Sequence, residues 1–256
     1  MMKWFERLRI RHTLKHHPVP HEMWEALMHK SPLFQRLSPV DRAHLRELVT
    51  LFLHRKTFTG VQGLTVSDEM ALAVAAQACL LILKLDLDYY DGWIEIVLYP
   101  GAFQVERAFV DDAGLVLNEA RTLSGESWSH GAVILSWADV AAELNSRGAG
   151  RNVVVHEFAH KLDMLNGSAN GMPALHAEME WAQWTAAFSH AYDELNQQLD
   201  VYQSPSINPY AATDPAEFFA VASEYFFTAP DVLIDHYPDV YAQLVLFYRQ
   251  APIFRA

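Results

Sequence analysis

The chain has 256 residues, of which 51% are hydrophobic and 20% are charged, and its 11 Gly and 12 Pro are ordinary numbers for a globular protein. This composition excludes a disordered chain and a fibrous repeat, and the length allows one large domain or two small ones. The formal net charge of −12 argues against sequence-independent DNA binding, because most of the surface would repel phosphates. The single cysteine, Cys79, excludes an intramolecular disulfide and suits a reducing cytoplasm.

The charge is distributed unevenly along the chain. Residues 1–56 hold 11 Lys and Arg against 5 Asp and Glu, a balance of +6, whereas residues 57–256 hold 8 against 26, a balance of −18. Seven of the 13 histidines also lie within the first 54 residues. We interpret the basic front as a helical layer that could act as a docking surface. The acidic remainder would favour basic peptides or partners.

The start of the chain and its apolar stretches indicate whether a secretory signal or a membrane-spanning helix is expected. The first 20 residues are basic but lack an apolar segment and a small-residue cleavage site, so a secretory signal is not expected. The longest uncharged apolar stretch, residues 70–83, has 14 residues, whereas a bilayer span needs about 20. We therefore expect a buried core helix here, no membrane span and a soluble protein.

The first part of the chain contains two sequence patterns that are typical of helix N-termini. Ser38 is expected as the N-cap of a helix and Pro39 as its first residue, where a missing N–H does no harm. The apolar residues from Leu45 to Leu53 then follow helical spacing. Ser67 in the same way opens the apolar helix over residues 70–83.

From about residue 92 the periodicity becomes that of strands, and later that of helices again. Strands are predicted at residues 93–99, 114–118 and 132–137. Helices are predicted at residues 152–165, 174–199, 215–228 and 238–250, with loops at 166–173 and 202–214. Helices, a small sheet and more helices predict an α+β fold. No Gly/Ser/Pro-rich linker divides the chain, so we expect one compact domain over residues 1–256.

The most informative segment is VVVHEFAHKLD, residues 153–163, which contains H-E-x-x-H in a helical context. Because four residues make slightly more than one turn, His156 and His160 project from one face, and both imidazoles can reach one metal ion. Glu157 lies beside that face, where its carboxylate can accept a proton from water. A charged surface helix is the alternative, but the apolar flanks predict burial, which is costly for these side chains without a metal. Histidine ligands favour zinc over magnesium or calcium.

A catalytic zinc ion usually has three protein ligands, and the motif supplies two of them. The extension that would add a third histidine is absent, because Lys161, Leu162 and Asp163 follow His160. In residues 208–227 a second helix-start signal is followed by Glu217 in a very apolar helix, where the helix dipole favours an ionised carboxylate. Glu224, seven residues later, lies on the same side. By itself Glu217 could equally be an ordinary first-turn carboxylate.

Together these segments resemble a known family. HEFAHKLD and, some sixty residues later, PYAATDPAEFFAVASEYFF are similar to Mlc titration factor A, a family of bacterial cytoplasmic zinc peptidases of the gluzincin type. DYYDGWIEIVLYPGAF and GLVLNEARTLSGESWSHGAVILSW extend the resemblance over about residues 60–250, which we expect to form a zincin-like peptidase body behind the basic layer of residues 1–56. The spacing from Tyr210 to Glu217 is also similar to the peptidase domain of anthrax lethal factor.

The resemblance implies a role for each candidate residue. One zinc ion per chain would be held by His156, His160 and Glu217, with Glu157 as the general base and the hydroxyl of Tyr210 directed at the substrate carbonyl. It also implies aminopeptidase-like activity on short peptides in the cytoplasm. The rival reading is a regulatory protein that binds a Mlc-type transcriptional repressor of sugar-uptake genes, and the two roles can coexist. Direct nucleic-acid binding is not expected.

Three further features each allow two interpretations, and two further residues have one. Asp163 could accept the second N–H of a ligand histidine or form a salt bridge with Lys161 or Arg151. Glu224 is the less favoured third ligand and otherwise an outer or structural acid. The strand at residues 132–137 could be the exposed strand that binds peptide or a buried central strand. His130 is best interpreted as a turn histidine, while Cys79 is expected to be an inert core residue.

Overall fold

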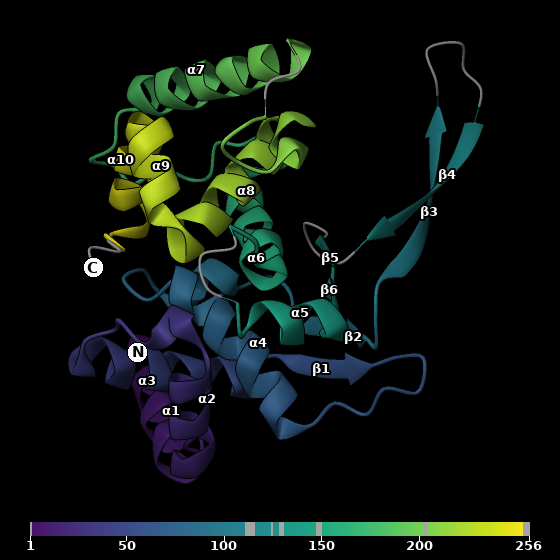
Figure 1. The fold of residues 1–256 in the computed structure, drawn as a ribbon. Helices are drawn as coiled ribbons and strands as arrows, with labels where there is room; N and C mark the ends of the chain where they lie inside the picture. Colours follow the sequence, from purple (N-terminus) through teal and green to yellow (C-terminus); the bar gives the residue numbers. More distant parts are fainter. Residues whose placement is uncertain are drawn as a thin grey trace.

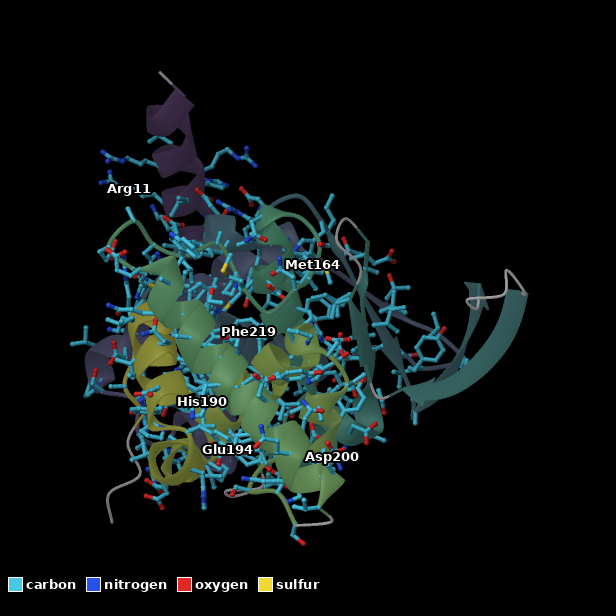
Figure 2. The ribbon with its side chains drawn as sticks, turned by 90° about the horizontal axis from the view of Figure 1, so that it is seen from above. Arg11, Met164, His190, Glu194, Asp200 and Phe219 are labelled. Atoms are coloured by element: carbon cyan, nitrogen blue, oxygen red, sulfur yellow. The ribbon has the colours of Figure 1, made fainter. Side chains whose placement is uncertain are left out.

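The computed structural model describes residues 2–110, 116–123, 125–127, 131–146, 150–201 and 204–252. The chain begins with a helical layer, as expected, drawn in purple and dark blue in Figure 1 and composed of α1 (Met2–His16), α2 (His21–Lys30) and α3 (Pro39–Arg55). The predicted N-cap is confirmed, since the Ser38 side chain accepts a hydrogen bond from the Asp41 N–H at 3.1 Å. Arg11 lies on the outside of α1 (Figure 2), which fits an exposed basic face.

A small mixed sheet follows this layer. It contains β1 (Thr57–Gly60), β2 (Glu95–Tyr99), β6 (Val133–Ser136) and β5 (Gly125–Ser127), in the order β1-β2-β6-β5. The first three strands are mutually parallel, and β5 is antiparallel to β6. The helix predicted within the apolar stretch is α4 (Asp68–Leu81), and Ser67 is its N-cap.

This topology corrects one prediction about strands and places another predicted strand outside the four-stranded sheet. The strand predicted at residues 132–137 is central, because β6 pairs with β2 on one side and with β5 on the other. Its exposed-strand reading is therefore wrong, and β5 occupies that edge of the sheet. The strand predicted at residues 114–118 is β4 (Val116–Leu123), which pairs with β3 (Phe103–Val110) in a separate two-stranded ribbon. This ribbon extends away from the helical body in Figures 1 and 2.

The second half of the chain is helical. Its helices are α5 (Trp137–Glu143), α6 (Val153–Asp163), α7 (Trp181–Asp200), α8 (Pro215–Thr228), α9 (Pro230–His236) and α10 (Pro238–Tyr248). The helix predicted from residue 174 begins later, at Trp181, because residues 176–179 form a turn in which the Met179 N–H donates to the His176 carbonyl oxygen at 2.9 Å. Among the described residues, no helix combines the length and apolarity that a membrane span needs.

The apolar side chains of the helix that carries H-E-x-x-H pack in the hydrophobic core. Phe158 is fully buried, and its ring lies 5.1 Å from Tyr90, 5.7 Å from Trp93 and 5.9 Å from Phe52, measured between ring centroids. Phe52 belongs to α3, so this aromatic cluster joins α6 to the N-terminal layer. α6 also packs against α4 and α8. The burial expected from the apolar flanks of the motif is confirmed.

We predict that Phe158→Ala lowers the free energy of unfolding by about 3–5 kcal/mol, because it empties a closely packed aromatic site. Trp181→Ala is the matched control, since Trp181 is 67% exposed and its removal should cost less than about 1 kcal/mol. Urea unfolding followed by circular dichroism measures both, with chelator present so that metal binding does not contribute. Equal losses in the two variants would contradict the role of this cluster.

Candidate metal centre

The two histidines of the motif converge because of where α6 begins and how it is buried. Asn152 is the N-cap of α6 and accepts a hydrogen bond from the Val155 N–H at 2.9 Å. One turn separates His156 from His160, and their Nε2 atoms lie 3.2 Å apart. Both side chains are about nine-tenths buried, so two nitrogen donors face each other in a partly closed site.

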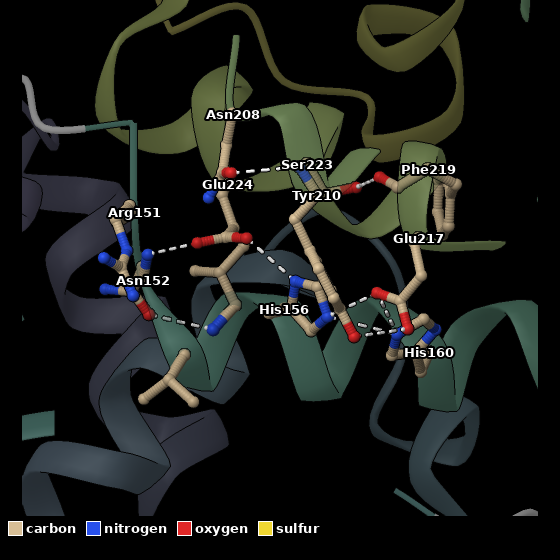
Figure 3. Close-up of polar contacts among 12 residues, drawn as sticks. Arg151, Asn152, His156, His160, Asn208, Tyr210, Glu217, Phe219, Ser223 and Glu224 are labelled. Atoms are coloured by element: carbon tan, nitrogen blue, oxygen red, sulfur yellow. Dashed lines mark hydrogen bonds and ion pairs between the residues drawn. The ribbon is translucent and has the colours of Figure 1, made fainter. Parts of the chain in front are cut away.

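The third donor comes from the first turn of α8. Asp214 is the N-cap, accepting a hydrogen bond from the Glu217 N–H at 2.9 Å, and Pro215 is the first helical residue, both as predicted. This start directs the Glu217 carboxylate at α6, where Oε2 lies 2.9 Å from His156 Nε2 and 3.4 Å from His160 Nε2 (Figure 3). The three donor atoms all lie within 4.8 Å of one another.

These donors fit a metal ion. In a tetrahedral site with bonds of 2.0–2.1 Å to nitrogen and oxygen, donor atoms are separated by about 3.3 Å. The separations here are 2.9, 3.2 and 3.4 Å. Although Glu217 Oε2 is buried and close to two imidazoles, it has no hydrogen-bond partner of regular geometry among the described residues. A buried carboxylate oxygen left in this way is a ligand that a cation would satisfy.

The candidate donors also determine one another's ionisation. Burial alone would lower the pKa of His156, but the carboxylates of Glu217 and Glu224 raise this pKa well above its usual range. Burial alone would raise the pKa of Glu217, but the imidazoles of His156 and His160 hold it far below its usual range. Glu217 is thus held in its ionised form, which is the form in which a carboxylate binds a cation.

Glu157 lies on α6 beside the ligand cluster, 4% exposed, and its Oε2 has no hydrogen-bond partner among the described residues. Burial is the largest influence on this carboxyl group and raises its pKa to about 7, against the lowering effect of His156 and His160. A carboxyl group with a pKa near 7 can both accept and return a proton. The structure thus places a candidate general base next to the three donors.

His156 is oriented by a buried chain of hydrogen bonds that extends from α8 to α4. Its Nδ1 lies 2.8 Å from Glu224 Oε1, and Glu224 Oε2 accepts the Asn152 N–H at 2.5 Å. Asn152 Nδ2 in turn donates to Gln77 Oε1 at 2.6 Å. Glu224 therefore contacts the imidazole nitrogen that faces away from the donor cluster, where a carboxylate fixes the tautomer and ring orientation of a ligand histidine. Of the two interpretations of Glu224, the geometry therefore favours an acid that supports a ligand histidine over a third metal ligand.

Asn152 and Gln77 were not identified from the sequence as parts of the site. The only available signal was Gln77 itself, a polar residue within a long apolar helix, which is fully buried and therefore needs a partner. Its partner lies 75 residues further along the chain. The distance between such residues in the sequence conceals their contact.

Asp163 holds a loop in place. Its Oδ2 accepts hydrogen bonds from the main-chain N–H groups of Asn170 and Gly171, at 2.9 and 2.8 Å. Gly171 has φ +78°, and a Cβ there would lie 2.4 Å from the Pro215 carbonyl oxygen, so this loop abuts the start of α8 and requires glycine. Among the described residues, Asp163 Oδ1 and His160 Nδ1 have no hydrogen-bond partner. The contacts that the structure gives Asp163 are therefore neither of the two that we expected.

Tyr210 reaches the same cluster from a 3-10 turn, Pro209–Ala212, that precedes α8. The Asn208 side chain begins this turn by accepting the Tyr210 N–H at 3.1 Å. The Tyr210 hydroxyl donates to Glu217 Oε1 at 3.2 Å, and its ring centroid lies 6.0 Å from that of His156. Because the side chain is 42% exposed, its hydroxyl group lies between the donor cluster and solvent.

The remaining residues of interest lie elsewhere. His176 packs on Phe247 and approaches its carbonyl oxygen at 2.8 Å through Nε2, away from the donor cluster. Cys79 is fully buried in α4, and burial raises the pKa of its thiol well above the usual value, as expected for a core residue. His130 lies outside the described residues.

Comparison with known proteins gives a consistent result over the whole chain. The sequence profile of the family described as "Glucose-regulated metallo-peptidase M90" matches residues 3–249. Mlc titration factor A of Cronobacter sakazakii is 37% identical over 258 residues, covering 100% of this chain and 94% of that protein. Mlc titration factor A of Klebsiella pneumoniae is 37% identical, covering 91% of this chain, and an uncharacterised Synechocystis protein is 37% identical, covering 92%. The similarity thus includes the basic N-terminal layer, beyond the residues 60–250 expected from the sequence.

We predict that Glu224→Gln weakens zinc binding by about 10- to 100-fold, because the uncharged amide no longer strengthens the His156 donor. Competition with a chromophoric chelator measures the zinc dissociation constant. Glu178→Gln is the matched control: Glu178 pairs with Arg249, and its side chain is 63% exposed. An unchanged zinc affinity in Glu224→Gln would show that this carboxylate does not support the metal centre.

Proposed function

This chain belongs to the M90 family of metallo-peptidases, and we propose that it hydrolyses peptide bonds at a zinc ion held by His156, His160 and Glu217. The observation that carries the proposal is the convergence of two imidazole nitrogens and one carboxylate oxygen within 4.8 Å, beside a buried glutamate on the same helix. The nitrogen and carboxylate donors match those of catalytic zinc in other peptidases. A zinc ion here would act as a Lewis acid that polarises the scissile carbonyl and makes an attacking water more acidic.

The proton transfers are assigned to Glu157. Its buried carboxyl group accepts the proton of the attacking water and later delivers it to the leaving amine. Both steps are supported by a pKa raised to about 7, largely through burial, and by an Oε2 atom that has no other hydrogen-bond partner among the described residues. The same group can therefore serve as base and then as acid near neutral pH.

Tyr210 is assigned to the substrate carbonyl. Its hydroxyl group donates a hydrogen bond to Glu217 Oε1 at 3.2 Å, and the residue is partly exposed. A substrate that enters from solvent would therefore contact this hydroxyl group at the edge of the donor cluster. A phenol donor at this position can stabilise negative charge that develops on the carbonyl oxygen. Glu217 then holds the Tyr210 hydroxyl near the reacting atoms in the free protein.

The substrate is proposed to be a short peptide, cleaved in an aminopeptidase-like manner and bound as in zincins. β5 lies at one end of the sheet order, next to β6, and packs against α6 (Figure 1). A strand in this position can accept an extended peptide by β-augmentation, which would run the substrate along the helix that carries His156 and Glu157. The cytoplasmic location that the resemblance implies stays a prediction.

We propose a second role because two of the compared relatives, one of which is 37% identical to this chain over its full length, are named Mlc titration factor A. By that analogy this chain binds a Mlc-type transcriptional repressor, and the basic N-terminal layer is a candidate docking surface for an acidic face of that partner. This role needs neither the zinc ion nor Glu157.

Glu157→Gln is expected to keep its zinc and to lower kcat/KM for peptide hydrolysis by about 10²- to 10⁴-fold, because the amide cannot accept the proton of water. Peptide hydrolysis followed by mass spectrometry gives the activity, and elemental analysis gives the zinc content of the same preparation. Glu47→Gln, an exposed change on α3, is the control and should leave both values unaltered. Full activity in zinc-loaded Glu157→Gln would refute the assignment.

The repressor role predicts that capture of a Mlc-type repressor by the immobilised chain survives both Glu157→Gln and zinc chelation. Charge reversal of the α1 residues Arg9 and Arg11 to Glu should reduce capture, and the loss should be smaller at high salt, where the charges are screened. If chelation abolishes capture while the fold persists by circular dichroism, the two roles share one site.

A further inference from the structure

The turn that carries Tyr210 lies at the protein surface and packs against both α7 and α8 (Figure 1). Inside the turn, the Ala211 N–H donates to the Asn208 carbonyl oxygen at 3.0 Å. The Thr213 N–H donates to the Tyr210 carbonyl oxygen at 3.1 Å. A single 3-10 turn with two such hydrogen bonds is weak by itself. Its shape therefore depends on the groups that contact it from neighbouring elements.

Tyr192 of α7 makes such a contact at the end of the turn. Its hydroxyl group donates a hydrogen bond to the carbonyl oxygen of Ala212, the last residue of the turn, at 3.1 Å. The Tyr192 ring lies 5.9 Å from the ring of Phe218, at an interplanar angle of 89°. Phe218 is 1% exposed and directly follows Glu217 on α8. Packing against this buried ring holds the Tyr192 side chain, so that its hydroxyl group joins α7 to the turn.

The position of the turn matters for the donor cluster because Tyr210 extends from it to Glu217. The Tyr210 hydroxyl donates to Glu217 Oε1 at 3.2 Å, and Oε2 of the same carboxylate faces His156 and His160. Ala211 is the one buried residue of the turn, and Tyr210 itself is 42% exposed, so burial does little to fix the Tyr210 side chain. A displacement of the main chain at the end of the turn would move Tyr210 away from Glu217.

We propose that Tyr192 is a positioning residue of the candidate metal centre. By holding the Ala212 carbonyl oxygen, it keeps the Tyr210 hydroxyl group on Glu217 Oε1 and directed at the substrate carbonyl. Its effect on hydrolysis is exerted through Tyr210 and rests on the proposed function, whereas its hold on the turn does not. The two parts are therefore tested separately.

Amide hydrogen exchange, followed by mass spectrometry, tests the hold on the turn. Tyr192→Phe removes the hydroxyl group and keeps the ring packed against Phe218, so the fold is retained. We expect exchange of the Ala211 and Thr213 amides to become about fivefold faster, which corresponds to the loss of one hydrogen bond. Unchanged exchange at these two amides would overturn the proposal, whether or not the protein is a peptidase.

Tyr241→Phe is the matched control. Tyr241 is half-buried, as Tyr192 is, and its hydroxyl group also donates to a main-chain carbonyl oxygen, that of Pro252 at 3.4 Å. This change should leave both the exchange of the Tyr210 turn and peptide hydrolysis unaltered. Equal acceleration of the turn in Tyr192→Phe and Tyr241→Phe would show a general loosening of the fold and would overturn the specific role of Tyr192.

A double-mutant cycle with Tyr210→Phe tests the effect on hydrolysis, with L-leucine 4-nitroanilide as the probe substrate. Tyr192→Phe should lower kcat about tenfold and change KM by less than about twofold, because the Tyr210 hydroxyl is assigned to charge that develops only in the transition state. In a chain that already carries Tyr210→Phe, the same change should lower kcat by less than about twofold. Elemental analysis verifies that the proteins are compared at equal zinc content.

The failures of the two proposals differ. An unchanged kcat in Tyr192→Phe, or an equal loss of kcat with and without the Tyr210 hydroxyl, would overturn the positioning role and leave the proposed function intact. A zinc-loaded wild-type chain that hydrolyses neither the probe nor other short peptides would overturn the proposed function and the catalytic part of this role. The exchange of Ala211 and Thr213 would even then decide whether Tyr192 holds the turn.

Discussion

The contact between His156 and Glu224 joins the two helices on which the metal centre depends. α6 supplies two imidazoles and α8 supplies Glu217, so the donor set exists only while these helices keep their relative position. Glu224 fixes that position from within, because one of its oxygens meets His156 and the other meets the N-cap residue of α6. Since both contacts are buried, loss of either partner would leave a charge or donor unsatisfied. The geometry of the donors is thus a consequence of helix packing.

The N-caps of α6 and α8 both orient residues of the candidate metal centre. Asn152 and Asp214 each cap a helix with a side-chain oxygen, and in each case a metal-directed residue follows within four positions. A cap fixes the first turn, and the first turn is where helix side chains vary most in direction when a helix frays. The burial of Phe158 fixes α6 from its other face, through an aromatic cluster shared with α3. The basic N-terminal layer therefore also supports the site that it does not line.

The sequence was sufficient for those parts of the site that rest on local patterns. The spacing of His156 and His160 is a property of one helix, and the Asp214-Pro215 pair marked the turn that carries Glu217. It was insufficient where the outcome depends on contacts between distant segments. Whether residues 132–137 form an edge depends on β5, a three-residue strand with no periodicity to detect. The partners of Asp163 belong to a loop whose path is set by the close approach of Gly171 to Pro215. The series of hydrogen bonds from Gln77 through Asn152 to Glu224 joins three helices that are far apart in the sequence.

The origin of the donors on two different helices means that they are not held equally firmly. His156 and His160 share a short helix held by the core, so neither can withdraw without disturbing Phe158 and its neighbours. Glu217 instead sits in the first turn of α8, next to the partly exposed Tyr210 and the turn that carries it. The position of the Glu217 donor therefore depends on the Asp214 cap, whereas the two imidazoles are held by the core. A metal ion bound here would be held by two donors from the buried helix and by a third donor from the more exposed start of a neighbouring helix.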